Sequence, residues 1–303
     1  MAKYQFKSVI FLSIIFFLCL FPACKTSQDN SLSTISTREV VDDLGRKIKI
    51  PVKIERIVSL APNLTETVFA IGAGNKLIGV TTFCNYPEET AKINKIGDTI
   101  NPNLEAIIAL KPQVVFVSTA SQIENFTKTL EQQNIAVFVT NPQNIDGIYQ
   151  SILQIGDVVG EAEKAKILVE SLRKRAADVE ARTLSAKDVK VFVQIAKEPL
   201  FTVGKNSFMT DLVGRAGGIS VTADVNEAYP KFSKETALAL QPEAIILSES
   251  DDNQEPNDVF KNSPAVKNGK IFKIKADLLS RPGPRMFDGL EQIAKALHPE
   301  SFE

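Results

Sequence analysis

LEAIIALKPQVVFVS, residues 104–118, returns later in the chain in altered form as KETALALQPEAIILS, residues 234–248. The two copies share five positions: Glu105 with Glu235, Ala109 with Ala239, Leu110 with Leu240, Pro112 with Pro242, and Ser118 with Ser248. Each copy is typical of a short helix, a turn marked by proline and a buried parallel strand, because a continuous apolar run follows the proline. The repeat therefore predicts two similar α/β halves.

The rest of the chain extends this pattern. In the first half we expect a hairpin at 40–51, strands at 56–60, 77–80 and 135–140, and a helix capped by Asn63 with Glu66 three residues later, as in a capping box. In the second half we expect strands at 189–195 and 269–274 and helices at 207–217 and 284–297. Strands that alternate with helices indicate parallel sheets.

A long helical region separates the two halves. Ile145–Val159 has apolar residues at helical spacing, Gly160 interrupts it, and residues 161–185 contain neither glycine nor proline. At 1.5 Å per residue the second helix would be roughly 36 Å long, enough to bridge two small domains. A mature chain of about 280 residues also favours two domains over one core. We expect an N-terminal lobe at 39–141, a stiff connecting region at 142–186 and a C-terminal lobe at 187–303.

The N-terminus has the features of a secretory signal. Lys3 and Lys7 precede an apolar stretch, Val9–Phe21, that is shorter than the about 20 residues of a spanning helix. The sequence Phe21-Pro22-Ala23-Cys24 resembles a bacterial lipobox, so residues 1–23 are predicted to be removed and Cys24 to be lipidated. The alternative is an ordinary signal peptide with an incidental cysteine. Residues 24–38 are rich in polar side chains and predict a flexible tether, which would hold the protein outside the cytoplasm at a membrane.

Composition excludes several classes of function. Without residues 1–23 the chain has a formal charge of about −3 and no basic patch, so we expect no nucleic-acid partner. Cys19 would be removed with the signal and Cys24 would be lipidated, so Cys84 would have no cysteine partner. A disulfide is therefore excluded in the lipidated monomer. The sole histidine is His298, so a histidine-rich metal site cannot be built. We expect neither a bound metal nor a resident cofactor.

The whole chain resembles the cobalamin- and siderophore-type periplasmic binding proteins, which capture substrates for ABC importers. The resemblance covers residues 40–300. Its carriers are Arg56-Ile-Val-Ser-Leu-Ala-Pro-Asn63 with Thr65-Glu66, Thr82-Phe-Cys-Asn-Tyr-Pro87, Asn103-Leu-Glu105 through Leu110-Lys-Pro112, Phe201-Thr-Val-Gly204, and Arg281-Pro-Gly-Pro-Arg285.

This resemblance implies a fold and a partner. The fold would be two Rossmann-like lobes with parallel sheets, joined by a single long rigid α-helix, with the ligand in the cleft between the lobes. The partner would be a permease dimer with its ATPase subunits, and the free binding protein would be a monomer. In such proteins one acid on each lobe docks onto arginine pockets of the permease, and Glu105 and Glu235 match these positions. The alternative role is stabilisation of the helix dipole, about 0.3–1 kcal/mol for each acid.

Ligand-binding residues are expected in loops after the carboxyl ends of the strands. These candidates are Pro62, Asn63, Phe83, Asn85, Tyr86, Ser118, Thr119, Phe201, Tyr229, Ser248, Asp277 and Arg281. Tyr86, Phe201 and Tyr229 offer flat faces for a large ring system, although each could pack in a core instead. Arg281 could clamp an anionic ligand or form a salt bridge with Asp277 or Asp288.

The residues favour a cobalamin-like corrinoid, which is nearly neutral and rich in amides. A strongly anionic ferric siderophore calls for several basic residues, and Arg281 and Arg285 are the candidates. Haem would need Tyr86, Tyr229 or Met286 as its axial ligand. Both remain alternatives.

A secreted two-domain enzyme is the alternative from another class. The sequence has no nucleophile elbow, P-loop or histidine-based triad. Cys84 would depend on the distant His298 as its base, and a buried, inert thiol is the favoured interpretation. We therefore expect a binding protein and not an enzyme.

Overall fold

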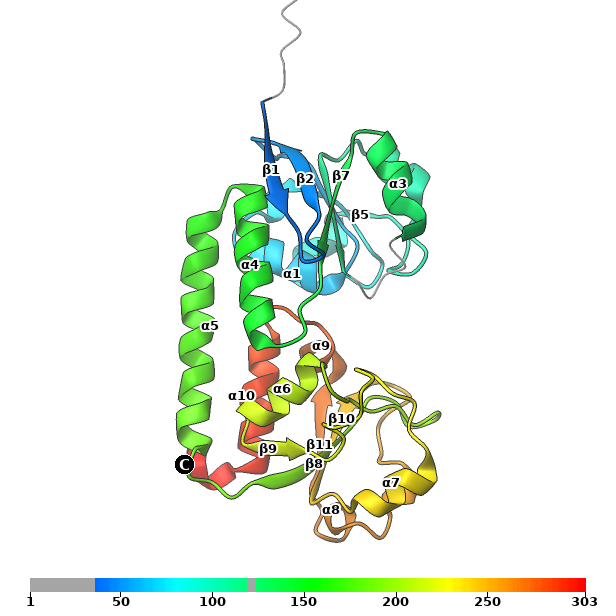
Figure 1. Ribbon diagram of the computed structural model, residues 1–303, viewed down its shortest axis with the longest axis vertical. Helices are drawn as coiled ribbons and strands as arrows, with labels where there is room; N and C mark the ends of the chain where they lie inside the picture. Colours follow the sequence, from blue (N-terminus) through cyan, green and yellow to red (C-terminus); the bar gives the residue numbers. More distant parts are fainter. Residues whose placement is uncertain (1–35, 119–123) are drawn as a thin grey trace, which may run out of the picture. The chain divides into compact units, whose positions relative to one another are not determined.

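The computed structural model describes residues 36–118 and 124–303 of the chain. The predicted signal peptide, Cys24, most of the tether and the candidate Thr119 lie outside the described residues. Ser36–Glu303 forms one compact unit that contains two parallel sheets and a long helical hairpin (Figure 1). In the described ranges, no helix combines the length and apolar character needed to cross a membrane.

The first lobe is built on a five-stranded parallel sheet in the order β5-β4-β3-β6-β7. Its strands are β3 Ile57–Ser59, β4 Leu77–Val80, β5 Asn94–Lys95, β6 Val114–Ser118 and β7 Ala136–Thr140. Its helices are α1 Pro62–Ala70, α2 Leu104–Ala109 and α3 Glu124–Gln132, with the 3-10 turns η1 Gly74–Lys76 and η2 Glu88–Lys92. An antiparallel hairpin, β1 Thr37–Val41 and β2 Lys47–Pro51, precedes the sheet.

The second lobe has a four-stranded parallel sheet in the order β11-β10-β8-β9. Its strands are β8 Val189–Gln194, β9 Gly218–Ser220, β10 Ala244–Glu249 and β11 Ile271–Lys275. Its helices are α6 Phe208–Arg215, α7 Lys234–Leu240, α8 Pro264–Lys267, α9 Ala276–Leu279 and α10 Met286–Leu297, with the 3-10 turns η3 Asp258–Phe260 and η4 Pro299–Phe302.

The sequence repeat forms the same unit in both lobes. In each copy a short helix, α2 or α7, leads into a fully or almost fully buried strand, β6 or β10. The residue before the shared proline is in the left-handed region in both copies, with φ of 47° at Lys111 and 44° at Gln241. A residue before proline is disfavoured in the right-handed helical region, so the helix has to end there and the chain turns into the strand. The predicted α/β fold with two parallel sheets is confirmed.

Two antiparallel helices connect the lobes. α4 Ile145–Val159 is capped by the Asn144 side chain, which accepts a hydrogen bond from Gly147 N, and ends at Gly160 with φ of 79°. α5 Ala162–Thr183 is about 33 Å long at 1.5 Å per residue. It packs against α4 at one end and against α10 at the other, so it contacts helices associated with both sheets (Figure 1).

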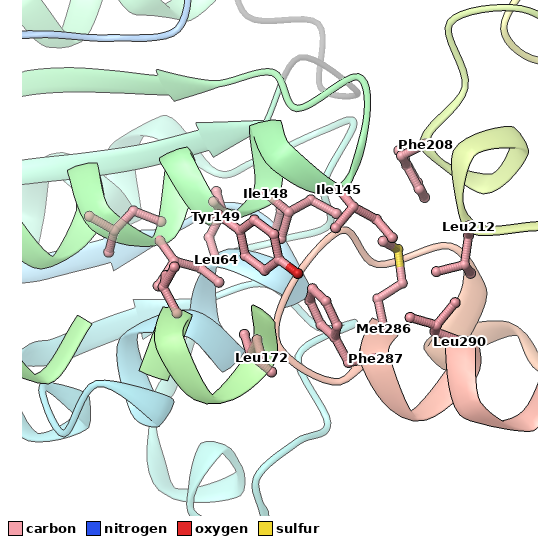
Figure 2. Packing of buried hydrophobic residues seen from close by; sticks show 14 of the residues in the cluster. Leu64, Ile145, Ile148, Tyr149, Leu172, Phe208, Leu212, Met286, Phe287 and Leu290 are labelled. Carbon is pink, nitrogen blue, oxygen red and sulfur yellow. The ribbon is translucent and has the colours of Figure 1, made fainter. Parts of the chain in front are cut away.

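The hydrophobic core is continuous through this helical layer. One cluster of buried residues includes Leu64 on α1, Tyr149 on α4, Leu172 on α5 and Phe287 on α10 (Figure 2). The Tyr149 and Phe287 rings stack with centroids 5.4 Å apart. Smaller clusters cover the opposite faces of the two sheets. The lobes therefore have separate sheets but share a core, which differs from the expectation of two independent cores.

Two local expectations are wrong. Thr37 and Arg38, assigned to the tether, belong to β1, where Arg38 pairs with Asp157 at 2.7 Å. The predicted capping box at Asn63 does not form, because Pro62 starts α1 and Ala61 occupies the N-cap position without a side-chain bond. Proline lacks an N–H and has a fixed φ, so it suits the first position of a helix. Asn63 and Glu66 are thereby free to make contacts with the second lobe.

Candidate ligand-binding cleft

A cavity of about 690 Å³ lies between the two lobes. We call it the interlobe cleft. Its volume is within the range of small-molecule binding sites. It is lined by Ala61, Pro62, Asn63, Phe83, Thr99, Ser118, Asn141, Pro142, Gln143, Ile195, Asn206, Phe208, Met209, Ala228, Tyr229, Asp277, Ser280, Arg281 and Pro282.

The first lobe contributes the ends of neighbouring parallel strands. Pro62 and Asn63 follow β3 at the start of α1, Ser118 is the last residue of β6, and residues 141–143 follow β7. In an open parallel sheet, the carboxyl ends of the strands meet at one edge, where ligands bind. The order β3-β6-β7 therefore brings these three segments to one wall of the cleft.

The second lobe contributes a pair of aromatic side chains that contact each other. Phe208, at the start of α6, meets Tyr229 edge to face with ring centroids 6.2 Å apart. Ser207 caps α6 through its side chain. Burial raises the pKa of the Tyr229 hydroxyl, and a hydrogen bond with the Ser207 side chain partly opposes this shift. The neutral phenol is therefore favoured at this position.

Two aromatic side chains of the cleft remain accessible. Phe83 of the first lobe is 57% exposed and Tyr229 of the second is 43% exposed. Large exposed aromatic groups that line a cavity are suited to stack on a flat ligand. Each lobe thus supplies one such ring.

Four charged residues form an ion cluster at one side of the cleft, and we call it the Glu66 cluster: Glu66, Asp277, Arg281 and Arg285. Arg281 Nη1 lies 2.8 Å from Glu66 Oε1, and Arg281 Nη2 lies 2.6 Å from Asp277 Oδ1. Arg285 Nε lies 3.0 Å from Glu66 Oε2. The Glu66 carboxylate, on the first lobe, therefore binds two arginines of the second lobe.

Neighbouring groups complete this cluster. Arg281 Nη1 also donates to Asn85 Oδ1 at 2.8 Å. The guanidinium of Arg285 lies over the Tyr86 ring, 4.0 Å from its centroid. Asn63 Nδ2 donates to the carbonyl of Pro282 at 3.3 Å, a further bond between the lobes. Polar contacts therefore join the lobes beside the cleft.

The structure brings together seven of the predicted binding residues. Those that line the interlobe cleft are Pro62, Asn63, Phe83, Ser118, Tyr229, Asp277 and Arg281. Arg281 lines the cleft and forms the expected salt bridge with Asp277. Its role as a clamp for an anionic ligand stays a prediction. The expected partner Asp288 instead pairs with Arg175 at 2.6 Å.

Four other predicted residues do not line the cleft. Asn85 contacts it indirectly, through its bond with Arg281. Tyr86 is 47% exposed and borders a separate cavity with Arg285. Phe201 is held by backbone bridges to Ala196 and Lys231. Ser248 is buried in β10.

The sequence interpretation missed several lining residues. Asn141, Pro142 and Gln143 follow β7, so the same strand-end rule could have identified them. Phe208 and Met209 belong to the first turn of α6, which reaches the cleft by packing and not by following a strand end. No signal in the sequence distinguishes them from core residues.

The remaining candidates lie away from the cleft lining. Glu105 and Glu235 are exposed in the first turns of α2 and α7. Cys84 is buried, and its Sγ lies 3.2 Å from the hydroxyls of Thr65 and Thr81, as expected of a packed thiol. His298 Nε2 lies 3.0 Å from the Gly217 carbonyl. Within residues 36–118 and 124–303, no group of three or more His, Cys, Asp or Glu side chains could hold a metal ion.

Comparisons with known proteins place this chain in a family. The sequence profile of the family described as periplasmic binding protein matches residues 57–278. An uncharacterized ABC transporter substrate-binding lipoprotein of Bacillus subtilis (strain 168), YvrC, is 31% identical over 288 residues, covering 92% of this chain and 91% of that protein. The chain therefore belongs to the periplasmic binding protein family, whose members are substrate-binding transport proteins.

Solved structures agree with this assignment. The periplasmic vitamin B12 binding protein of Vibrio cholerae matches with a TM-score of 0.73 at 26% identity, over 84% of this chain and 100% of that one. The periplasmic haem-binding protein RhuT of Roseiflexus sp. RS-1 has a TM-score of 0.73 at 22% identity, over 82% of this chain and 99% of that one, and shares the fold. The predicted family is confirmed, and the chain is a binding protein of the kind that delivers ligands to ABC importers.

Proposed function

We propose that this protein is an extracytoplasmic lipoprotein that captures a cobalamin-like corrinoid in the interlobe cleft and delivers it to an ABC permease. It acts by binding and release, without catalysis or a resident cofactor. The ligand assignment depends on the charge of the residues that line the cleft. Among the described residues of the lining, Asp277 and Arg281 are the charged ones, and they are paired with each other at 2.6 Å.

A near-neutral ligand suits such a lining. The other lining groups are apolar, aromatic or small amides and hydroxyls, such as Asn63, Asn141 and Gln143. Amide side chains of a corrinoid can exchange hydrogen bonds with these groups, while its ring stacks on Phe83 or Tyr229. A ligand with several carboxylates would meet no unpaired arginine in the described lining.

Haem is the second candidate. Tyr229 has a hydroxyl at the cleft, and a tyrosine oxygen can serve as an axial ligand of haem iron. The charges of the lining favour the corrinoid over haem, because haem carries two carboxylates and the lining residue Arg281 is already paired with Glu66 and Asp277.

Delivery would use the paired glutamates. Glu105 and Glu235 occupy the same position of two capped helices, one on each lobe, and neither forms an ion pair with another described residue. Exposed carboxylates that form no ion pair with another described residue are available for arginines of a permease dimer. We propose that the free protein is a monomer that docks through these two groups.

Membrane attachment would use Cys24. The relative from Bacillus subtilis is described as a lipoprotein, which supports a lipid anchor after signal removal. In a native host, Cys24→Ser should shift the protein from the membrane fraction to the soluble fraction. Persistence of the variant in the membrane fraction would contradict the anchor.

A titration tests the ligand. Cyanocobalamin, haemin and a ferric trihydroxamate or catecholate siderophore are each added to residues 25–303, and ligand absorbance and tyrosine fluorescence are followed. The chain has no tryptophan, so the protein emission is that of tyrosine. We expect submicromolar binding of cyanocobalamin, equivalent to more than about 8 kcal/mol. Tight haemin binding with a shifted Soret band would replace the corrinoid with haem.

A further inference from the structure

The Glu66 side chain is a buried acid that lies outside the described lining of the interlobe cleft. Glu66 lies in α1, is 3% exposed and does not line the interlobe cleft. Its two oxygens accept from Arg281 Nη1 and Arg285 Nε of the opposite lobe. An unpaired carboxylate at such a site would be strongly disfavoured, so its position depends on both arginines.

The Glu66 cluster contains equal numbers of acidic and basic groups. Two carboxylates, Glu66 and Asp277, face two guanidinium groups, Arg281 and Arg285. Both terminal nitrogens of Arg281 have acceptors, because Nη1 donates to Glu66 and Asn85, and Nη2 pairs with Asp277. An arginine whose terminal nitrogens are paired and whose charge is balanced offers little to an anion in the cleft.

We propose that Glu66 sets the charge selectivity of the interlobe cleft. Glu66 lies outside the lining and forms ion pairs with Arg281 and Arg285. Together with Asp277 it balances the charge of the two arginines, which disfavours anionic ligands in the cleft. Glu66 is a positioning residue, since it acts on the ligand through Arg281. The inference rests on the proposed use of the cleft as the ligand site.

Replacement of Glu66 by glutamine tests this proposal most directly. Glu66→Gln keeps the shape and removes one negative charge, which leaves the cluster with an excess of one positive charge beside the cleft. A ligand anion would then be attracted, whereas a neutral ligand of the same shape would not. A purely structural role of Glu66 predicts equal effects on both ligands.

A matched pair of dyes provides the test without knowledge of the natural ligand. 8-Anilinonaphthalene-1-sulfonate and N-phenyl-1-naphthylamine share one ring system and differ by a sulfonate, and both fluoresce when bound in apolar surroundings. In folded Glu66→Gln we expect the affinity for the sulfonate, relative to the neutral dye, to rise roughly tenfold. In Glu66→Gln/Arg281→Gln this gain should disappear.

Two outcomes would overturn the inference. One is an unchanged affinity ratio in folded Glu66→Gln, and the other is a gain that persists without Arg281. If Glu66→Gln does not fold, Arg285→Gln takes its place, because the Arg285 side chain is 21% exposed and its loss leaves an excess of negative charge. The relative affinity for the sulfonate should then fall roughly tenfold, and an unchanged ratio would equally reject the proposal.

The same variants separate this inference from the proposed function. If wild-type protein binds no cyanocobalamin, the corrinoid assignment fails, whereas the dye ratios still test Glu66. If cyanocobalamin binds, its monocarboxylic acid derivative, with one amide hydrolysed, is a second matched pair. Wild type should prefer the amide, and Glu66→Gln should reduce that preference by roughly tenfold.

Discussion

Glu105 and Glu235 are each the second residue of a helix and each lie two residues after a capping side chain. Asn103 Oδ1 accepts from Ala106 N in α2, and Ser233 Oγ accepts from Thr236 N in α7. The caps already satisfy an N-terminal N–H of each helix, so the glutamates are not needed for that purpose. Their carboxylates therefore remain exposed at equivalent positions of the two lobes.

Charge reversal at these glutamates should lower transport without weakening ligand binding. Glu105→Lys and Glu235→Lys should each lower transport in cells by at least about tenfold, because a lysine would repel a permease arginine. Affinity for the ligand should stay within about twofold of wild type, since both residues lie outside the cleft lining. Uptake assays and ligand titrations measure the two effects.

Glu170→Lys is the control for this pair. Glu170 is exposed on α5 and forms no ion pair with another described residue, so the same charge change is made away from α2 and α7. It should leave transport unchanged. Loss of ligand binding in either docking variant would contradict the assignment of roles.

Aromatic residues that line the cleft should affect affinity more than those that do not. Phe83→Ala and Tyr229→Ala should each weaken binding of the captured ligand by roughly tenfold or more, because each removes a stacking surface. Tyr86→Ala should weaken it by less than about threefold, since Tyr86 packs on Arg285 outside the cleft. Equal losses in titrations of all three variants would favour the sequence-based expectation for Tyr86.

The stacked pair of Tyr149 and Phe287 should be important for stability. Phe287 is fully buried between the connecting helices and the second lobe. Phe287→Ala should lower the free energy of unfolding by about 3–5 kcal/mol, measured by urea denaturation. Leu184→Ala is the control, because Leu184 is 86% exposed and its replacement should change stability by less than about 0.5 kcal/mol. A small effect at Phe287 would indicate that the lobes do not share this core.

Tyr149 should make the protein sensitive to alkaline pH. Burial raises the pKa of Tyr149 from its ordinary value of 10.0 to about 12. The unfolded chain therefore releases this proton first, so the stability from the neutral phenol is fully present below pH 10 and is lost as pH rises through about 12. Tyr149→Phe lacks this ionisation. Its free energy of unfolding should fall less than that of wild type between pH 9 and pH 11.5, and parallel pH profiles would contradict this.

Much of the fold is readable from the sequence because it depends on local patterns. The apolar runs Val114–Ser118 and Ala244–Glu249 can be buried only as inner strands, and each follows a helix and a proline turn. The long stretch without glycine or proline before Thr183 likewise predicts α5. The capping box failed because Pro62 competes for the same helix start and has the stronger conformational preference.

The lining residues that directly follow a strand end are the ones that the sequence predicts best. Pro62, Asn63 and Ser118 were found in this way, and Asn141 could have been. Phe208 was not, because its place depends on how α6 packs in the other lobe. Tyr86 and Phe201 are expected in the cleft because they follow strand ends and are aromatic, but neither property specifies the direction of a side chain.

The sequence by itself determined the two α/β halves, the helical connection between them and the equivalence of Glu105 and Glu235. These features follow from periodicity, turn residues and an internal repeat, all of which act within short segments of chain. The tertiary structure decided that Glu66 binds Arg281 and Arg285. Residues separated by more than 200 positions meet only when both lobes have packed on the shared helical layer. No local pattern in the sequence predicts such a contact.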